Sequence, residues 1–215
     1  GVILTSVSRH PDKALAIVDA SALIDAGEMK KLRKYIGKGM RVWLWGLVPE
    51  TLAFYEPLLP LPLNIEKLGR SSYLPVQRSW MRGLNNSDFY FCELQRDNAS
   101  DYSLAGPFVQ EGAVLLNACR TDWRTWNKRA EKLKTAAVLR SENECTAATP
   151  VIVENNGVVV STLKNFAGSE KGYRTFAAML RNAGVPCDRV GHNPDDMCFI
   201  REGRLMLPAS TAERT

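Results

Sequence analysis

The sequence predicts a single α/β domain in which parallel strands alternate with helices. Three observations carry this prediction: residues 14–46 read as strand, helix, strand; an Asn-Gly turn at 156–157 separates two apolar runs; and an amphipathic helix follows over 169–184. A strand, a helix of about three turns and a second strand form the right-handed crossover that feeds a parallel sheet. The turn and the last helix add a hairpin-helix unit near the C-terminus.

The first strands and helix have clear local signals. The apolar runs at 2–7 and 14–18 each predict a buried strand. Asp25 and Glu28 have the spacing of a capping box, which begins a helix. A further strand is predicted over 41–46. The apolar stripe of the helix and the glycines that end it are Met29, Leu32, Ile36, Gly37 and Gly39.

Trp43 and Trp45 alternate along the strand predicted over 41–46, so they share one side of it. Two tryptophans on one side could form a stacking platform for a sugar ring. Packing beneath a helix is the other interpretation, and we favour it because large aromatic side chains contribute most to protein cores.

The middle of the chain is the least regular part, because several prolines interrupt it. Its expected elements, in order, are a short helix from 49 to 55, an edge strand over 63–68, a turn at 83–87, a strand over 88–94, a polar loop over 97–107 and a strand over 113–118.

The C-terminal part carries the clearest hairpin signal. Strands over 151–154 and 158–163 are joined by Asn155-Asn156-Gly157, and Asn-Gly supplies the positive φ angles of a tight turn. Ser169 is expected to cap the last helix, whose buried stripe is Tyr173, Phe176, Ala177 and Leu180 and whose stop is Gly184. We expect one domain over 1–186 and a C-terminal extension or linker over 187–215.

Composition bounds the class of protein. The chain has 215 residues, of which 45% are hydrophobic and 24% charged, which excludes a disordered tail. We expect no membrane segment, because no stretch reaches the roughly 20 apolar residues that a spanning helix needs. The chain begins with Gly1 and no leader precedes Val2, which is typical of an excised piece or a processed product. Its compartment is therefore left open.

The five cysteines are odd in number and include no C-x-x-C pair. This pattern argues against a disulfide framework and against a zinc site, so we expect reduced, mostly structural cysteines and no metal. No glycine-rich loop has the spacing of a phosphate-binding motif, and we expect no cofactor.

The positive charge is clustered. Between residues 120 and 140 there are seven bases and two acids, within a chain of net charge +5. Arg124, Lys128 and Lys132 form a row on a predicted helix over 122–140, where a polyanion, a glycan or an acidic partner domain could dock. We favour the alternative of a solvated helix face, and we do not expect nucleic acid as a partner.

Catalytic candidates are few. His10 and His192 belong to no recognisable motif. Cys119 follows a predicted strand and precedes a predicted helix, where a helix dipole could lower its pKa, but the small neighbours of a nucleophile elbow are missing. We favour a buried structural cysteine. Carboxylates that a glycosidase could use are present but cannot be paired: Asp19, Glu50, Asp88, Glu93 and Glu154.

Two stretches resemble a known family. Residues 16–24, AIVDASALI, through residues 32–46, LRKYIGKGMRVWLWG, resemble the glutamine-amidotransferase-like domains of bacterial β-galactosidases. Residues 157–163, GVVVSTL, and 179–185, MLRNAGV, are similar to the closing strand and helix end of the same domains. The resemblance implies a flavodoxin-like, three-layer module with a mostly parallel sheet, related to the β-galactosidase trimerisation domain and lacking the catalytic cysteine and histidine of amidotransferases.

The resemblance implies a non-catalytic accessory domain of a multidomain glycoside hydrolase. Its partners would be the catalytic domain of the same parent chain and, in an oligomer, further copies of the chain. Two alternatives stay open: a cysteine-dependent hydrolase or amidotransferase that uses Cys119, and a glycan- or polyanion-binding module that uses the helix over 122–140 or the tryptophans. A fold-level likeness does not by itself assign a function.

Overall fold

The computed structural model describes most of the predicted domain. The described residues are 2–4, 15–68, 71–77, 79–89, 102–120, 148–163, 170–185, 199–201 and 204–206. Among the helices within these ranges, none is both long enough and apolar enough to cross a membrane.

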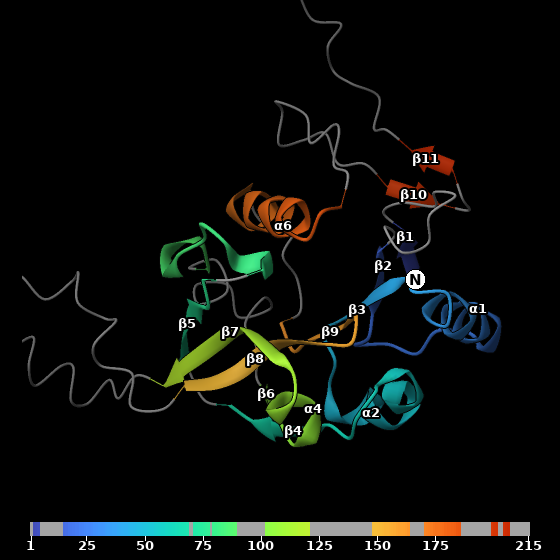
Figure 1. Cartoon of the computed structure of the whole chain (residues 1–215), viewed down its shortest axis with the longest axis horizontal. Coiled ribbons are helices and arrows are strands. Elements are labelled where there is room, and N and C mark those ends of the chain that lie inside the picture. Colours follow the sequence, from blue (N-terminus) through green and yellow to red (C-terminus); the bar gives the residue numbers. More distant parts are fainter. Residues whose placement is uncertain are drawn as a thin grey trace, which may run out of the picture.

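A seven-stranded mixed sheet forms the centre of the molecule (Figure 1). β2, β3 and β9 pair in parallel, and every other pairing within this sheet is antiparallel. In spatial order the strands are β1 (Val2–Leu4), β2 (Leu15–Asp19), β3 (Arg41–Trp45), β9 (Val158–Ser161), β8 (Ala148–Asn155), β7 (Ala113–Arg120) and β5 (Ser71–Pro75).

The prediction of a mostly parallel sheet is therefore wrong, although the α/β class is confirmed. The cause is the hairpin between β8 and β9, in which Asn156 has a φ of 48° and Gly157 a φ of 78°. A two-residue turn of this kind can only join antiparallel strands. β8 thus reverses the direction of the sheet, and β7 and β5 continue it with antiparallel pairings.

The parallel part is built as predicted. The helix α1 (Ala26–Ile36) connects β2 to β3, and the side chain of Asp25 accepts a hydrogen bond of 2.8 Å from the Glu28 amide at its start. Its own side chains Met29 and Leu32 are buried in the core between helix and sheet. This unit places the carboxyl ends of β2 and β3 at the same edge of the sheet.

Each face of the sheet is covered, which gives three layers (Figure 1). On one face pack α6 (Glu170–Asn182) and the 3-10 turns η3 (Ser79–Met81) and η4 (Asn86–Phe89). The other face, which we call the lower layer, carries α1, α2 (Pro49–Tyr55), η2 (Glu56–Leu58), α4 (Pro107–Gln110) and a two-stranded sheet of β4 (Asn64–Lys67) and β6 (Tyr102–Ala105).

The predicted ends of the last helix and of the chain have different outcomes. α6 ends at Asn182, and Gly184 in the turn that follows has a φ of 73°, as expected of the predicted stop. Ser169 and the side chain of Tyr173 lie outside the described part. Within 187–215, β10 (Phe199–Arg201) pairs with β11 (Arg204–Met206), and β10 lies beside β1. That this segment is an extension or linker stays a prediction.

The middle of the chain differs from expectation at several points. The short helix and the edge strand β4 are confirmed, whereas β5, β6 and α4 were not predicted. The strand expected over 88–94 is wrong at its beginning, because Asp88 and Phe89 belong to η4. The Asp88 carboxylate accepts a hydrogen bond of 2.8 Å from the Asn85 amide, and such local bonds favour a turn over a strand. The rest of that segment lies outside the described residues.

Candidate functional site

Trp43 is a core residue. It is fully buried beneath α6, and its ring centroid lies 5.4 Å from that of Trp80, 5.5 Å from that of Trp45 and 5.6 Å from that of Phe176. Trp45 is half-buried, with its ring centroid 5.3 Å from that of Phe176. Trp43 therefore has no free ring face for a sugar, and the pair packs beneath a helix.

Cys119 is not a free thiol. It lies in β7 with 2% of its surface exposed, and its sulfur is in a disulfide. The expectation of reduced cysteines is wrong at this position, because a disulfide depends on proximity in the fold and not on spacing in the sequence. A disulfide sulfur has no thiolate form and cannot act as the nucleophile of a hydrolase. Four cysteines lie outside the described residues: Cys92, Cys145, Cys187 and Cys198.

The row Arg124, Lys128 and Lys132 also lies outside the described part, as do both histidines and Glu93. The docking role of this basic row stays a prediction. Within the described ranges no group of three or more His, Cys, Asp or Glu side chains could hold a metal ion.

The carboxylates considered for glycosidase chemistry come from different parts of the fold. Glu50 begins α2 in the lower layer, whereas Asp88 lies in η4 on the opposite side of the sheet. Two carboxylates separated by a sheet cannot flank one glycosidic bond, which requires a separation of about 5–10 Å across a shared cleft. These two residues are therefore not a catalytic pair.

In an open α/β sheet, ligands bind outside the carboxyl ends of the parallel strands, where successive helices change sides. Here that point lies between β3, which is followed by α2 on one face, and β9, which is followed by α6 on the other. Ser161 is the last residue of β9 and Thr162 comes directly after it, and both are buried at this point. The Ser161 hydroxyl accepts from the Leu163 amide at 3.2 Å, and the Thr162 hydroxyl donates to the Tyr102 carbonyl at 2.8 Å. Both groups hold the backbone in place and do not face a ligand.

The loop after β2 begins at the same edge, and side chains of α2 hold its backbone. The Asp19 carboxylate accepts from the Ser21 amide at 3.1 Å and from the Ser21 hydroxyl at 2.6 Å, which makes a closed turn. Thr51 donates to the Ala20 carbonyl at 2.6 Å, and Tyr55 donates to the Ala22 carbonyl at 2.6 Å. The hydroxyls of α2 thus set the path of an exposed loop.

Replacing Tyr55 by Phe is expected to remove a pH dependence of stability. Burial, and next the Asp19 carboxylate, raise the pKa of Tyr55 from 10.0 to about 12. Its contribution is present below pH 10.0 and is lost as the pH rises towards 12, because the unfolded phenol ionises first. Because the hydroxyl is part-buried beside an exposed loop, solvent screening reduces the loss over this window to about 1 kcal/mol.

Urea unfolding at pH values across this window measures the difference between wild type and Tyr55→Phe. At neutral pH the variant should be less stable by about 1 kcal/mol, the usual cost of a lost hydrogen bond. Equal slopes of stability against pH in the two proteins would contradict the assignment.

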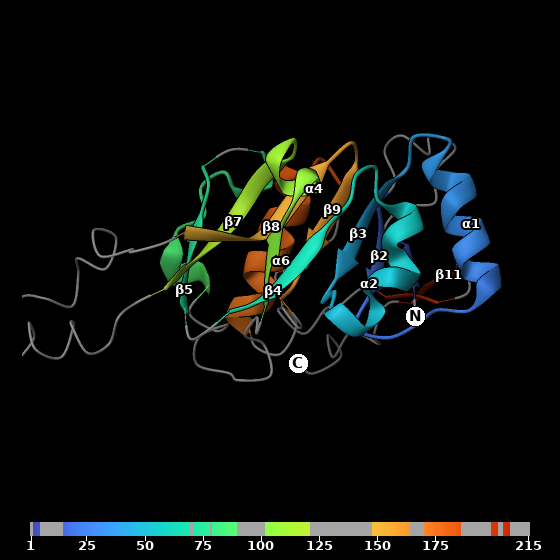
Figure 2. The same ribbon diagram turned by 90° about the horizontal axis from the view of Figure 1, so that it is seen from below.

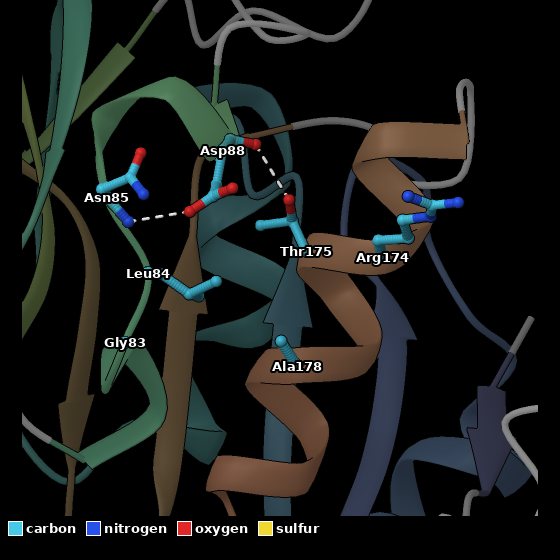
Figure 3. Close-up of a pocket in the computed structure, with 7 residues that line it drawn as sticks. All are labelled: Gly83, Leu84, Asn85, Asp88, Arg174, Thr175 and Ala178. Carbon is cyan, nitrogen blue, oxygen red and sulfur yellow. Dashed lines mark hydrogen bonds between the residues drawn. The ribbon is translucent and has the colours of Figure 1, made fainter.

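A hollow of about 570 Å³ lies between the η3–η4 connection and α6 (Figure 3). Leu84 and Ala178 form its apolar part, and Thr175 donates to the Asp88 carbonyl at 2.9 Å across it. Figure 3 shows the Arg174 side chain extending away from Asn85 and Asp88. The hollow offers polar groups to a small ligand, but it brings together no nucleophile and base. No local pattern of residues predicted it, because its two walls meet only in the fold.

Comparisons with known proteins give a single kind of likeness. None of the family models and none of the curated proteins matches the chain. Among solved structures, the chain is similar to α-L-fucosidase isoenzyme 2 from Paenibacillus thiaminolyticus, with a TM-score of 0.40 and 12% identity. The match covers 80% of this chain and 24% of that chain, so this chain spans about a quarter of the length of the fucosidase.

Proposed function

We propose that the chain is a non-catalytic accessory domain of a multidomain, β-galactosidase-like glycoside hydrolase, and that it serves interdomain packing or oligomerisation. One observation carries the proposal: three reactive side chains at or near the strand ends, Cys119, Ser161 and Asp19, are engaged in holding the fold. Cys119 is in a disulfide, Ser161 is buried with its hydroxyl bonded to the backbone, and Asp19 closes a turn. The disulfide removes the thiolate of Cys119, and the hydrogen bonds give the Ser161 hydroxyl and the Asp19 carboxylate a structural role.

The parent class is supported by the resemblance to the glutamine-amidotransferase-like domains of β-galactosidases. The stretches that carry it, 16–46 and 157–185, contain the parallel strands β2, β3 and β9 and the helices α1 and α6. They therefore form one contiguous part of the molecule. The antiparallel strands β8, β7 and β5 depart from a flavodoxin-like sheet.

The first test is to sequence the open reading frame on both sides of Gly1 and Thr215. We expect a sugar-hydrolase domain encoded in frame. Deletion of the 215-residue segment from that protein should leave glycoside hydrolysis by the isolated catalytic domain measurable, while its stability or assembly changes. A reading frame without a hydrolase domain would contradict the proposal.

The alternative of a cysteine-dependent enzyme makes an opposite prediction for Cys119. Treating the native protein with iodoacetamide before and after reduction, followed by peptide mass spectrometry, should give alkylated Cys119 only in the reduced and unfolded sample. The reason is that the sulfur is both buried and oxidised. Rapid alkylation of Cys119 in the unreduced, native protein would instead support a nucleophile. In an unfolded but unreduced sample, Cys119 should stay unalkylated if it is oxidised and should be alkylated if it was only buried.

A further inference from the structure

The outer side of α1 is strongly basic. Over nine residues the helix and the turn after it present five exposed bases, which we call the basic face. Two acids precede them at the start of the helix, the exposed Asp25 and the half-buried Glu28. The residues of the basic face are Lys30, Lys31, Arg33, Lys34 and Lys38. Long cationic side chains on an exposed helix create a positive potential at the surface.

The rest of the lower layer has the opposite charge. α2, η2, β4 and the end of α4 present four exposed acids, which we call the acidic face, and Lys67 is the base among these elements. The acids are Glu50, Glu56, Glu66 and Glu111. Figure 2 looks onto this layer, with α1 at one end, α2 beside it, and β4 and α4 towards the other end.

Apolar side chains lie between the charges. Leu52 and Phe54 of α2, Leu59 and Leu61 after η2, and Ile65 of β4 pack on the core below but remain partly exposed. Leu23, at the start of the loop into α1, is 63% exposed, the largest exposure of a large hydrophobic residue in the described part. A partly apolar centre with charged surroundings is the usual composition of a protein interface.

A layer that is positive at one end and negative at the other is complementary to itself. A twofold axis that runs parallel to the layer, perpendicular to the line from the basic to the acidic face, turns the second layer to face the first. It would place the basic face of one copy on the acidic face of the second, and the reverse contact would form at the same time. We propose that two copies of this chain associate through their lower layers in this way. The inference rests on the proposed packing or oligomerisation function and names its partner and surface.

The test uses charge reversal on each face in the 215-residue chain. One variant carries Lys30→Glu and Lys31→Glu, and the other carries Glu56→Lys and Glu66→Lys. Each variant alone should dimerise at least about tenfold more weakly in sedimentation equilibrium, because every reversed pair occurs twice across the axis and turns an attraction into a repulsion. An equimolar mixture of the two should form a heterodimer, since both contacts are then attractive again.

The matched control reverses two exposed bases of the opposite layer, Arg82→Glu and Arg181→Glu, and should leave the dimer unchanged. Raising the salt concentration should weaken the wild-type dimer, because surface charges are screened. A wild-type chain that stays monomeric at low salt, or variants whose mixture does not recover association, would overturn the proposal.

The same variants also test an anionic polymer as a different occupant of the basic face. A monomer that binds heparin, with binding lost in the Lys30→Glu, Lys31→Glu variant, would assign the basic face to an anionic polymer and overturn the dimer. Neither result bears on the accessory role itself, which depends on the neighbouring reading frame. Failure of the dimer and failure of the accessory function are therefore separate outcomes.

Discussion

Trp43→Ala is expected to lower the free energy of unfolding by about 3–5 kcal/mol, the range for truncating a large aromatic residue in a core. The indole is fully buried and its ring contacts those of Trp45, Trp80 and Phe176. Its removal leaves a cavity beneath α6 that neighbouring side chains fill only in part. Urea unfolding followed by far-UV circular dichroism measures the loss.

Trp45→Ala provides the matched control, because this side chain lies on the same strand but is only half-buried. Its loss of stability should be clearly smaller. If Trp43→Ala does not fold, Trp43→Phe keeps an aromatic ring and allows the comparison. Equal unfolding midpoints for wild type and Trp43→Ala would contradict the placement of Trp43 in the core.

Gly112→Ala is expected to destabilise the chain by about 1–3 kcal/mol through overpacking. A Cβ atom at this position would lie 2.6 Å from the Phe108 carbonyl oxygen, 2.7 Å from a Val153 methyl carbon and 3.0 Å from the Glu154 carbonyl oxygen. The Phe108 carbonyl accepts a hydrogen bond of 3.0 Å from the Asn155 side chain, so moving it breaks that bond. Thermal and urea unfolding measure the effect.

Gly37→Ala is the control for Gly112→Ala. Its Cβ would meet the Arg33 carbonyl oxygen at 3.5 Å, an ordinary contact, and its φ of −60° suits any residue. Its stability should change by less than about 1 kcal/mol. A similar effect of both substitutions would indicate that the gap between α4 and β8 is wider than described.

Local signals were sufficient for the elements that local chemistry determines. The capping residue Asp25 and the turn at Asn156 and Gly157 define their structures within a few residues, and both are confirmed. β5 and β6 were missed because their sequences, SSYLP and YSLA, have no clear alternation. They become strands through their pairing partners β7 and β4, which are distant in the sequence.

The candidate site was harder to predict for the same reason. Spacing could not reveal the disulfide of Cys119, because connectivity does not follow from sequence alone. The bases of α1 form the short run KKLRK from Lys30 to Lys34, which contains fewer bases than the cluster over 120–140. These bases and the acids Glu56 and Glu66 lie in one layer of the molecule. Only the fold shows which elements share a layer.

The position of β9 has a consequence for synthesis of the chain. β3 pairs early with β2 on one side, yet its second parallel neighbour, β9, begins only at Val158, which pairs with Val42. Contacts between such distant residues form slowly, because the long intervening segment must first be ordered. A ribosome-bound chain that ends before Val158 therefore displays β3 as an unpaired apolar edge, which is the kind of surface that chaperones protect and that aggregates when it is left open.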